Sequence, residues 1–599
     1  MTIGIKGGIK MYTELKSYQI VIAMLKKYGI KHLVLSAGSR NVPFVHSVEA
    51  DPFFKCYSVV DERSAGYFAL GLAQELNEPV LISCTASTAS CNYYPPVSEA
   101  FYQNVPIVIL TSDRDPEMLG QREDQMINQV GMFDRHVRKS VNLPIIYNKD
   151  NEHYCERLLN EALLELDHNG QKGPVHINVP MNSYNRTFNV KELPDVKKID
   201  RFYVSNQDKW KELANQLSLS KKIMVICGQE SFVSEKLNKE IKTFFEKYNC
   251  VIINDHMSNI DFDKAINTIV LMDDNYVSIS TLNNLMPDIV ISFGGQVFSG
   301  LKGQLKKNYC KFEHWLISEN GEVCDLFKGL KNIFECTPES FFEFFNNAAE
   351  ENSHNDNNYY NEFVKYKNSL KIPELGYSSM YAIKNVVESI ESNSILHLSI
   401  NDSIRISNFF DLKNDIKVYA NIGTYGIDGC MSTFLGQAAA APNKKAFLII
   451  GDLAFFYDMN SLRLNSLGKN VHILLINNHG GSEFYYNKTC IEPLGDLHTT
   501  ARHSTQAAGW VKDNNIKYLS STTKEEFDRN LVCFLNSDEP VLFEVFTEMK
   551  SDAEIIHDFY NYTKQHDIKT DIIRKTKELV KKSIGQEKAK KIIDILKNK

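Results

Sequence analysis

The sequence lacks several features that mark whole classes of protein. No apolar run approaches the ~20 residues needed to cross a bilayer, and the start, residues 1–10, has no apolar core of a secretory signal. The twelve cysteines form no CxxC pair and no cluster with histidine, which argues against structural zinc and against a disulfide framework. Net charge is −7 without an acidic or basic block in the body of the chain, so nothing indicates nucleic acid as a partner. We therefore expect a protein of a reducing compartment, by default the cytoplasm, without a transmembrane segment.

What is present is enough material for several cores. The chain has 599 residues, of which 43% are apolar. This length allows three or four domains of ordinary size, and this composition makes global disorder implausible.

The stretch 446–484 carries the most informative pattern. Two short apolar runs, 446–450 and 471–476, are separated by about one helix, and each ends in polar residues and glycine. Such runs predict a strand–helix–strand unit within a parallel sheet. Open sheets of this kind bind ligands beyond the carboxyl ends of their strands. Asp452 and Asn478, which follow the two strands, are therefore expected to lie side by side.

Asp452, Asn478 and Gly480 together predict a metal site. They offer a carboxylate, an amide oxygen and a backbone carbonyl at a residue where the chain can turn back on itself. Three oxygen ligands without Cys or His suit Mg²⁺ or Ca²⁺, and they leave an octahedral ion room for a diphosphate and a water. Either piece alone would be read as an ordinary turn or loop, but the pair at this spacing favours a metal–diphosphate site.

A Gly-Asp pair followed 26 positions later by Asn-Asn resembles the signature of thiamin diphosphate (ThDP) enzymes. Leu453 and the run Tyr-Asp-Met-Asn at 457–460 narrow the resemblance to the 2-succinyl-5-enolpyruvyl-6-hydroxy-3-cyclohexene-1-carboxylate (SEPHCHC) synthases, the MenD family of menaquinone biosynthesis. The resemblance covers most of residues 12–550. It implies an α/β fold of three domains with parallel sheets, ThDP and Mg²⁺ as cofactors, and a homodimer or homotetramer.

The implied domains are a pyrimidine-binding domain over 12–190, a central domain over 203–348 and a diphosphate-binding domain over 360–560. Polar stretches at 181–203 and 350–358 predict the linkers. A basic helical extension is expected over 561–599. Its apolar stripe could meet a membrane surface, but packing on its own domain or dimer is the preferred interpretation.

Glu62 is the activating acid that the resemblance implies. It follows a strand over 56–60 and opens a helix of small residues, where an acidic residue is usually only a solvated helix start. In ThDP enzymes a glutamate at this place hydrogen-bonds the aminopyrimidine and promotes the tautomer that removes the C2 proton. The run 61–73 matches the MenD family over thirteen positions, so this catalytic and cofactor-binding role is assigned to Glu62.

Further cofactor contacts are implied in the second half of the chain. Asp402 and Ser403 follow a strand over 395–400 and could cradle phosphate with their backbone. Gly426 and Ile427 match the family loop whose apolar residue bends the cofactor. Leu453, beside Asp452, completes the set.

The residues implied to face the substrates lie mostly in the first domain. Ser39 and Arg40 end a Ser-Ala-Gly-Ser-Arg run after a strand over 33–35, and in the family this pair faces the acidic groups of the acceptor. Arg114 and Gln125 match positions that contact intermediates, so Gln125 is also assigned a catalytic role. His479 stands where the family usually has asparagine and is a substrate-side candidate. His176 lies within a strand and is predicted to be a core residue.

The sequence departs from the family on the substrate side. Ile422 and Ser407 stand where the family usually has arginine, cations thought to hold substrate carboxylates. Arg405 could compensate, but two positions along a strand would change the face to which its side chain points. Glu483 is a further group that the family run lacks.

We interpret the chain as a ThDP- and Mg²⁺-dependent 2-oxo acid decarboxylase or carboligase that adds a donor enamine to an anionic or polyhydroxylated acceptor. One alternative is a true SEPHCHC synthase acting on 2-oxoglutarate and isochorismate. The other is a non-catalytic ThDP-fold subunit, against which the retention of Glu62, Asp452 and Asn478 speaks.

Overall fold

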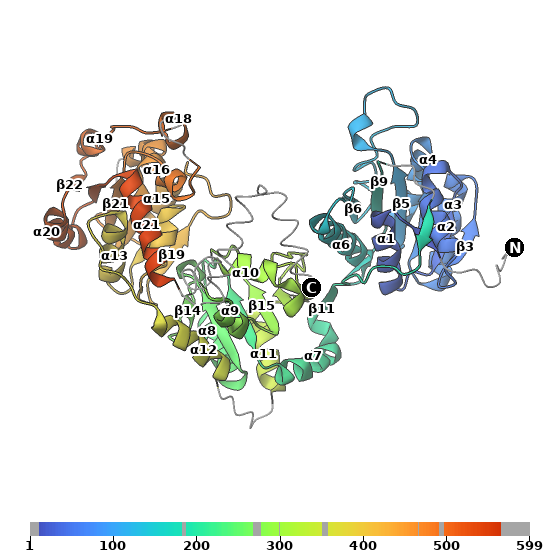
Figure 1. Cartoon of the computed structure of the whole chain (residues 1–599), viewed down its shortest axis with the longest axis horizontal. Coiled ribbons are helices and arrows are strands. Elements are labelled where there is room, and N and C mark those ends of the chain that lie inside the picture. The colour runs from blue at the N-terminus through green and yellow to red at the C-terminus, as the bar shows by residue number, and fades with distance from the viewer. Residues whose placement is uncertain are drawn as a thin grey trace, which may run out of the picture. The chain divides into compact units, whose positions relative to one another are not determined.

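A computed structural model describes residues 11–182, 187–267, 277–298, 300–349, 357–464, 467–489 and 496–564 (Figure 1). The helices predicted beyond residue 564, the start at 1–10 and most of the linker predicted at 350–358 lie outside the described residues. The chain forms two compact units. Unit 1 comprises residues up to 207 together with 319–335, and unit 2 comprises 208–318 together with the chain from 336 onward.

Unit 1 is built around a six-stranded parallel sheet. Its strands, in spatial order, are β3 (Lys55–Ser58), β2 (His32–Leu35), β4 (Val80–Cys84), β5 (Ile107–Asp113), β9 (Val175–Pro180) and β6 (Lys139–Asn142). Alternate residues of one strand enter different cores, since Leu33 and Leu35 pack with one cluster and Val34 with the other. The first cluster gathers α1 (Lys16–Lys27), α2 (Val42–Glu49) and α6 (Lys149–Leu163); the second gathers α3 (Glu62–Leu76), α4 (Thr88–Asn92) and α5 (Tyr94–Tyr102).

Short strands complete unit 1. β1 (Tyr12–Thr13) pairs with β10 (Phe188–Val190), β7 (Asp167–His168) pairs with β8 (Gln171–Lys172), and β11 (Asp200–Tyr203) pairs with β17 (Leu330–Glu335). The stretch predicted to be a linker at 181–203 therefore contains two strands. Both are secured by aromatic contacts, because Phe188 stacks on His46 and Phe202 stacks on Phe334.

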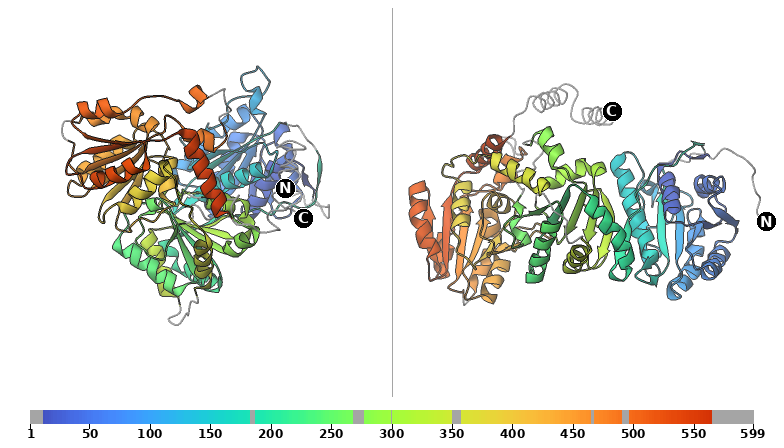
Figure 2. Two further views of the ribbon diagram at one scale, coloured as in Figure 1. Left: turned by 60° about the vertical axis from the view of Figure 1, so that its left-hand side comes forward. Right: turned by 90° about the horizontal axis from the view of Figure 1, so that it is seen from below.

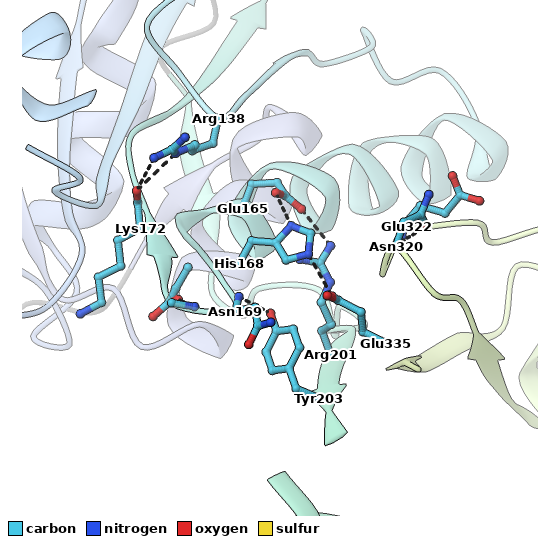
Figure 3. A network of polar contacts seen from close by, with 12 residues as sticks. Arg138, Glu165, His168, Asn169, Lys172, Arg201, Tyr203, Asn320, Glu322 and Glu335 are labelled. Carbon is cyan, nitrogen blue, oxygen red and sulfur yellow. Dashed lines mark hydrogen bonds and ion pairs between the residues drawn. The ribbon is translucent and has the colours of Figure 1, made fainter. Parts of the chain in front are cut away.

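A polar network ties β11 and β17 to the end of α6 within unit 1 (Figure 3). Arg201 donates to Glu165 at 2.8 Å, and the two ring nitrogens of His168 lie 2.9 Å from Glu165 Oε2 and from Glu335 Oε2. These contacts hold the inserted strand β17 to its unit.

Unit 2 contains two parallel sheets. The first runs β16 (Glu313–Ile317), β15 (Ile289–Phe293), β12 (Ile223–Cys227), β13 (Cys250–Asn254) and β14 (Ile266–Asn267). The helices of this part are α7 (Gln207–Leu219), α8 (Glu235–Lys247), α9 (Ile279–Leu285), α10 (Leu301–Lys307), α11 (Pro338–Ala348) and α12 (Asn358–Ser369). Trp210 and Trp315, both fully buried, anchor its core against Phe345.

The second sheet of unit 2 runs β19 (Lys417–Ala420), β18 (Ile395–Leu398), β20 (Ala446–Gly451), β21 (Val471–Asn477), β23 (Val541–Phe546) and β22 (Lys517–Ser521), all parallel. These strands belong to the yellow to dark red part of the ribbon in Figure 2. One face carries α13 (Ser379–Ser389), α14 (Asp402–Ser407), α20 (Lys524–Leu535) and α21 (Met549–Thr563). The other carries α15 (Cys430–Ala440), α16 (Asp452–Tyr457) and α19 (Ala508–Asp513). Helices on both faces of parallel sheets confirm the predicted α/β class.

Two six-stranded sheets share the same topological feature. The chain passes from β2 to β3 on one side and then to β4 on the other, and it passes in the same way from β18 to β19 and then to β20. Strand order reverses at these points, and open α/β sheets bind ligands at the carboxyl ends of the strands next to such reversals. No described helix is long and apolar enough to cross a membrane.

Candidate active site

Asp452 and the turn after β21 meet at the carboxyl edge of the second sheet of unit 2. β20 and β21 are direct neighbours, with Gly451 opposite Ile476, so their ends emerge side by side. The backbone N–H of Gly480 donates to Asp452 Oδ2 at 3.0 Å, and that of Leu453 donates to Oδ1 at 2.6 Å. Asp452 is only 2% exposed. The structure therefore brings together the two segments that were predicted to lie side by side.

Gly480 is required by its surroundings. Its φ is +148°, and a Cβ at this position would lie 2.7 Å from the Thr500 carbonyl oxygen and 2.8 Å from Met549 Sδ. The next residue, Gly481, donates its N–H to the same carbonyl of Thr500 at 2.8 Å. A side chain at 480 would thus push the turn away from Asp452.

The amide of Asn478 is oriented by Asp552 on α21. Asn478 Nδ2 donates to Asp552 Oδ2 at 3.4 Å, which leaves the amide oxygen as the group available to a ligand. Asp552 also accepts from the N–H of Ser379 at 2.9 Å and from Thr547 Oγ1 at 2.6 Å. Burial raises the pKa of the Asp552 carboxyl.

The Asp452 carboxylate, the Asn478 amide oxygen and the Gly480 carbonyl are hard oxygen donors, and this donor chemistry fits a small divalent cation such as Mg²⁺. Within the described ranges no group of three or more His, Cys, Asp and Glu side chains could hold a metal ion. A metal here would therefore depend on the amide and the carbonyl as well as on Asp452.

His503 is a neighbour of this site that sequence reasoning missed. Its Nε2 lies 3.3 Å from Asp452 Oδ2, and its backbone N–H donates to the carbonyl of His479 at 3.1 Å. The His479 and His503 rings are 6.2 Å apart, and His479 has a φ of +69°. No periodic pattern surrounds residue 503, so only the three-dimensional contact identifies it.

The other predicted cofactor residues lie at neighbouring strand ends. Asp402 opens α14 just after β18 and accepts a hydrogen bond from Ser482 Oγ at 2.8 Å, while Ser403 is buried. Gly426 and Ile427 lie in the loop after β19, where Ile427 is half-buried against the core that includes α15. Segments after β18, β19, β20 and β21 thus share one edge of the sheet.

The prediction that Arg405 lies on a strand is wrong. Residues 402–407 form the helix α14, so Arg405 projects next to Asp402, three residues earlier, and pairs with it at 3.1 Å. Arg405 also makes a two-pronged ion pair with Glu483, with distances of 3.0 and 2.9 Å. Ser407 and Ile422, where arginine is missing, are fully buried.

The first-domain candidates lie at the corresponding edge of the sheet of unit 1. Glu62 is the first residue of α3, which Asp61 caps by accepting from the N–H of Ser64 at 2.9 Å. Asn92 Nδ2 donates to Glu62 Oε2 at 3.4 Å. Arg40 donates its backbone N–H to Thr85 Oγ1 at 3.2 Å, so the loops after β2 and β4 touch at the point where strand order reverses.

Arg114, a predicted substrate-binding residue, is already paired with two carboxylates. Its guanidinium pairs with Glu123 and, at 2.8 Å, with Asp124, and this contact lowers the pKa of the Asp124 carboxyl. Gln125 follows directly with a left-handed φ of +51°. His176 is confirmed as a core residue: it is fully buried, its ring nitrogens contact Thr111 and Ser140, and burial lowers its pKa to about 3.

Comparison with known proteins agrees with this geometry. Residues 15–132 match the family described as thiamine pyrophosphate enzyme, N-terminal TPP binding domain. The 2-succinyl-5-enolpyruvyl-6-hydroxy-3-cyclohexene-1-carboxylate synthases of Bacteroides fragilis and Bacteroides thetaiotaomicron are each 36% identical to the chain, over 92% and 93% of it and 100% of each relative. The synthase of Flavobacterium johnsoniae is 29% identical over 92% of the chain and 99% of the relative. Identity of 36% over more than nine-tenths of the chain shows that it belongs to the SEPHCHC synthase family of thiamin diphosphate enzymes.

Proposed function

We propose that the protein is itself a SEPHCHC synthase. In this reaction 2-oxoglutarate loses CO₂, and the four-carbon unit that remains is added to isochorismate. The observation that carries this proposal is the contact between Asp452 and the Gly480 turn, at the strand ends next to the reversal between β18 and β20, in a chain that matches named synthases over their whole length. The cytoplasm is the proposed place of this reaction.

The proposed roles follow from the chemistry of each group. Asp452, Asn478 and Gly480 would hold the Mg²⁺ that ThDP requires, and the rest of the cofactor site would be lined by Asp402, Ser403, Gly426, Ile427 and Leu453. When bound, ThDP supplies the carbon nucleophile. Glu62 stabilises the proton on the aminopyrimidine ring. Ser39, Arg40, Arg114, Gln125 and His479 face the substrates, and Gln125 assists the chemistry.

We also propose the predicted domains: a pyrimidine-binding domain over 12–190, a central domain over 203–348 and a diphosphate-binding domain over 360–560. The active form is proposed to be a homodimer or homotetramer. Large apolar side chains exposed on the monomer support this proposal, because such side chains are typical of protein interfaces. They are Val60 just before α3, Tyr67 and Phe68 in α3, and Tyr102 at the end of α5. Sedimentation of an active monomer would contradict it.

A second candidate, a synthase with a different donor, is favoured by one specific observation. The buried Ser407 and Ile422 carry no charge, and Arg405 is already paired with two carboxylates. A 2-oxo acid without a second carboxylate would not need the arginines that the family usually has at positions 407 and 422.

The deciding experiment is a screen of 2-oxo acids with purified protein, ThDP and Mg²⁺, each with and without isochorismate. Product from 2-oxoglutarate and isochorismate, lost in Glu62→Gln, would support the synthase. Efficient use of only uncharged donors such as pyruvate would replace it with the second candidate. Absence of turnover with every donor would leave the non-catalytic subunit as the better interpretation.

A further inference from the structure

Arg405 lies among the strand-end segments that carry the proposed cofactor residues. Its guanidinium contacts Asp402 after β18 and Glu483 in α17 (Ser482–Tyr486) after β21. It also interacts with Tyr425 in the loop after β19, where its charge partly offsets the effect of burial, which raises the pKa of the Tyr425 hydroxyl to about 12. A cation with three strand ends around it stands beside the proposed active site.

The Arg405 guanidinium lies over an aromatic ring. The Arg405 guanidinium carbon lies 4.4 Å above the centre of the Tyr486 ring. Tyr486 is in turn held by His557, whose ring stacks at 4.9 Å and whose Nε2 contacts the Tyr486 carbonyl at 3.0 Å. The guanidinium meets Glu483 with two hydrogen bonds, the geometry in which arginine recognises a carboxylate.

The charges around Arg405 are unbalanced. One guanidinium faces two carboxylates, and its side chain is only 15% exposed. Burial raises the pKa of Asp402 to about 6, an effect that Arg405 opposes and Glu483 increases. Burial would also raise the pKa of Glu483, but Arg405 holds it below its usual range. The cluster therefore contains one carboxylate more than its cation can neutralise.

Glu483 is the partner that can leave. It lies in the first turn of the five-residue helix α17, its side chain is 23% exposed, and beyond Arg405 it contacts Asp402 and accepts from Asn487 Nδ2 at 2.7 Å. Asp402 is more firmly fixed, because it also accepts from Ser482 Oγ at 2.8 Å. Rotation of Glu483 toward solvent would free the two N–H groups that it now occupies, one on each Nη of Arg405, while Nη1 keeps its hydrogen bond to Asp402.

We propose that Arg405 binds the second carboxylate of a dicarboxylic 2-oxo acid donor, and that Glu483 is the internal carboxylate which the donor displaces. The inference rests on the proposed function, since it names the residue that would recognise the donor's side chain. One two-pronged pair replaces another in this exchange, so little interaction is lost. Glu483 also keeps the buried guanidinium paired while no donor is bound, as a buried charge requires.

The test compares 2-oxoglutarate with 2-oxobutanoate, which lacks the second carboxylate, at fixed isochorismate. Glu483→Gln removes the competing charge, so KM for 2-oxoglutarate should fall about tenfold while KM for 2-oxobutanoate stays unchanged. Arg405→Met should raise KM for 2-oxoglutarate about 10- to 100-fold, because a charge-assisted pair of hydrogen bonds is lost.

The variant Arg405→Met leaves two carboxylates unpaired. The double variant Arg405→Met with Glu483→Gln removes one of these charges and serves as the better-folded form. Lys384→Met, which breaks the ion pair with Glu388 on α13 of the same unit, is the matched control.

Direct binding separates this inference from the proposed function. Glutarate, titrated calorimetrically into the wild-type enzyme loaded with ThDP and Mg²⁺, should bind more tightly to Glu483→Gln and should fail to bind to the double variant. If no product forms from 2-oxoglutarate and isochorismate, the proposed function fails, and the glutarate series still decides the role of Arg405. Equal glutarate affinity in all variants, or equal changes in KM for both donors, would overturn the inference.

Discussion

Replacement of Gly480 by alanine tests the geometry of the proposed metal site most directly. The new Cβ would lie 2.7 Å from a backbone oxygen of Thr500 and 2.8 Å from Met549 Sδ, at a φ of +148°. The sulfur can move, since it is in a flexible side chain, but the carbonyl belongs to the segment that also receives the N–H of Gly481. The turn itself must therefore shift, and it will carry its N–H away from Asp452.

The magnitude follows from two costs. A non-glycine residue in such a backbone conformation costs about 1–3 kcal/mol, and overpacking costs about another 1–3 kcal/mol. Their sum, roughly 2–6 kcal/mol, is a large part of the ~5–15 kcal/mol that stabilises a typical domain. Loss of the hydrogen bond from Gly480 to the Asp452 carboxylate should weaken metal-dependent ThDP binding by about 10- to 100-fold.

The assay is urea unfolding together with calorimetric titration of ThDP in the presence of Mg²⁺. Gly451→Ala is the matched control, because Gly451 has an ordinary φ of −80° and no heavy atom within 4 Å of its added Cβ. We expect the control to behave like the wild type and Gly480→Ala to lose both stability and affinity. If Gly480→Ala kept the wild-type midpoint and affinity, the reasoning about this turn would be refuted.

Three further predictions concern the cofactor, the acid and pH. EDTA should abolish the binding of ThDP measured by calorimetry, and added Mg²⁺ should restore it. If the affinity for ThDP were unchanged in EDTA, the assignment of a metal site to Asp452 would be wrong. Glu62→Gln should keep the fold and ThDP affinity within about tenfold but slow C2 proton exchange by ~10²–10⁴, measured by NMR, and exchange at the wild-type rate would contradict its role. Burial lowers the pKa of His397 from 6.5 to about 4, so below pH 6.5 the unfolded chain takes up a proton that the folded chain does not. As the pH falls from 6.5 to 4, this residue should lower the free energy of unfolding by about 1.4 kcal/mol per pH unit. In urea titrations at several pH values, His397→Gln should make the free energy of unfolding depend less steeply on pH.

Much of the fold was predictable because its signals are local. The apolar runs at 446–450 and 471–476 became β20 and β21, since continuous short apolar runs fit strands that are buried on both faces. The contact between Asp452 and the Gly480 turn followed from this, because neighbouring parallel strands end at the same edge. Arg405 was misplaced for an equally local reason. Six residues after a strand are too few for helical periodicity to be recognised, and the helix turned the side chain toward Glu483.

Long-range polar contacts had no such signal. Glu544 is fully buried in β23, where it accepts from Asn477 Nδ2 and Tyr518 Oη at 2.7 Å and from the N–H of Ala507 at 3.1 Å. A glutamate within an apolar strand looks unfavourable in sequence. Its partners are supplied by segments up to 67 positions away, and the same contacts hold the chain that brings His503 to Asp452.

The hydrogen bond between Asp552 and Asn478 has a consequence for the order in which the protein matures. Asn478 depends for its orientation on a carboxylate that lies 74 positions nearer the C-terminus, and that carboxylate also accepts from Ser379 at the start of α13. During synthesis, when the chain leaves the ribosome N-terminus first, β20 and β21 can pair long before residue 552 has emerged. The Asn478 amide, which we propose faces the cofactor, therefore acquires its partner only after α21 has docked, and on this proposal the site for ThDP is completed only at that late step.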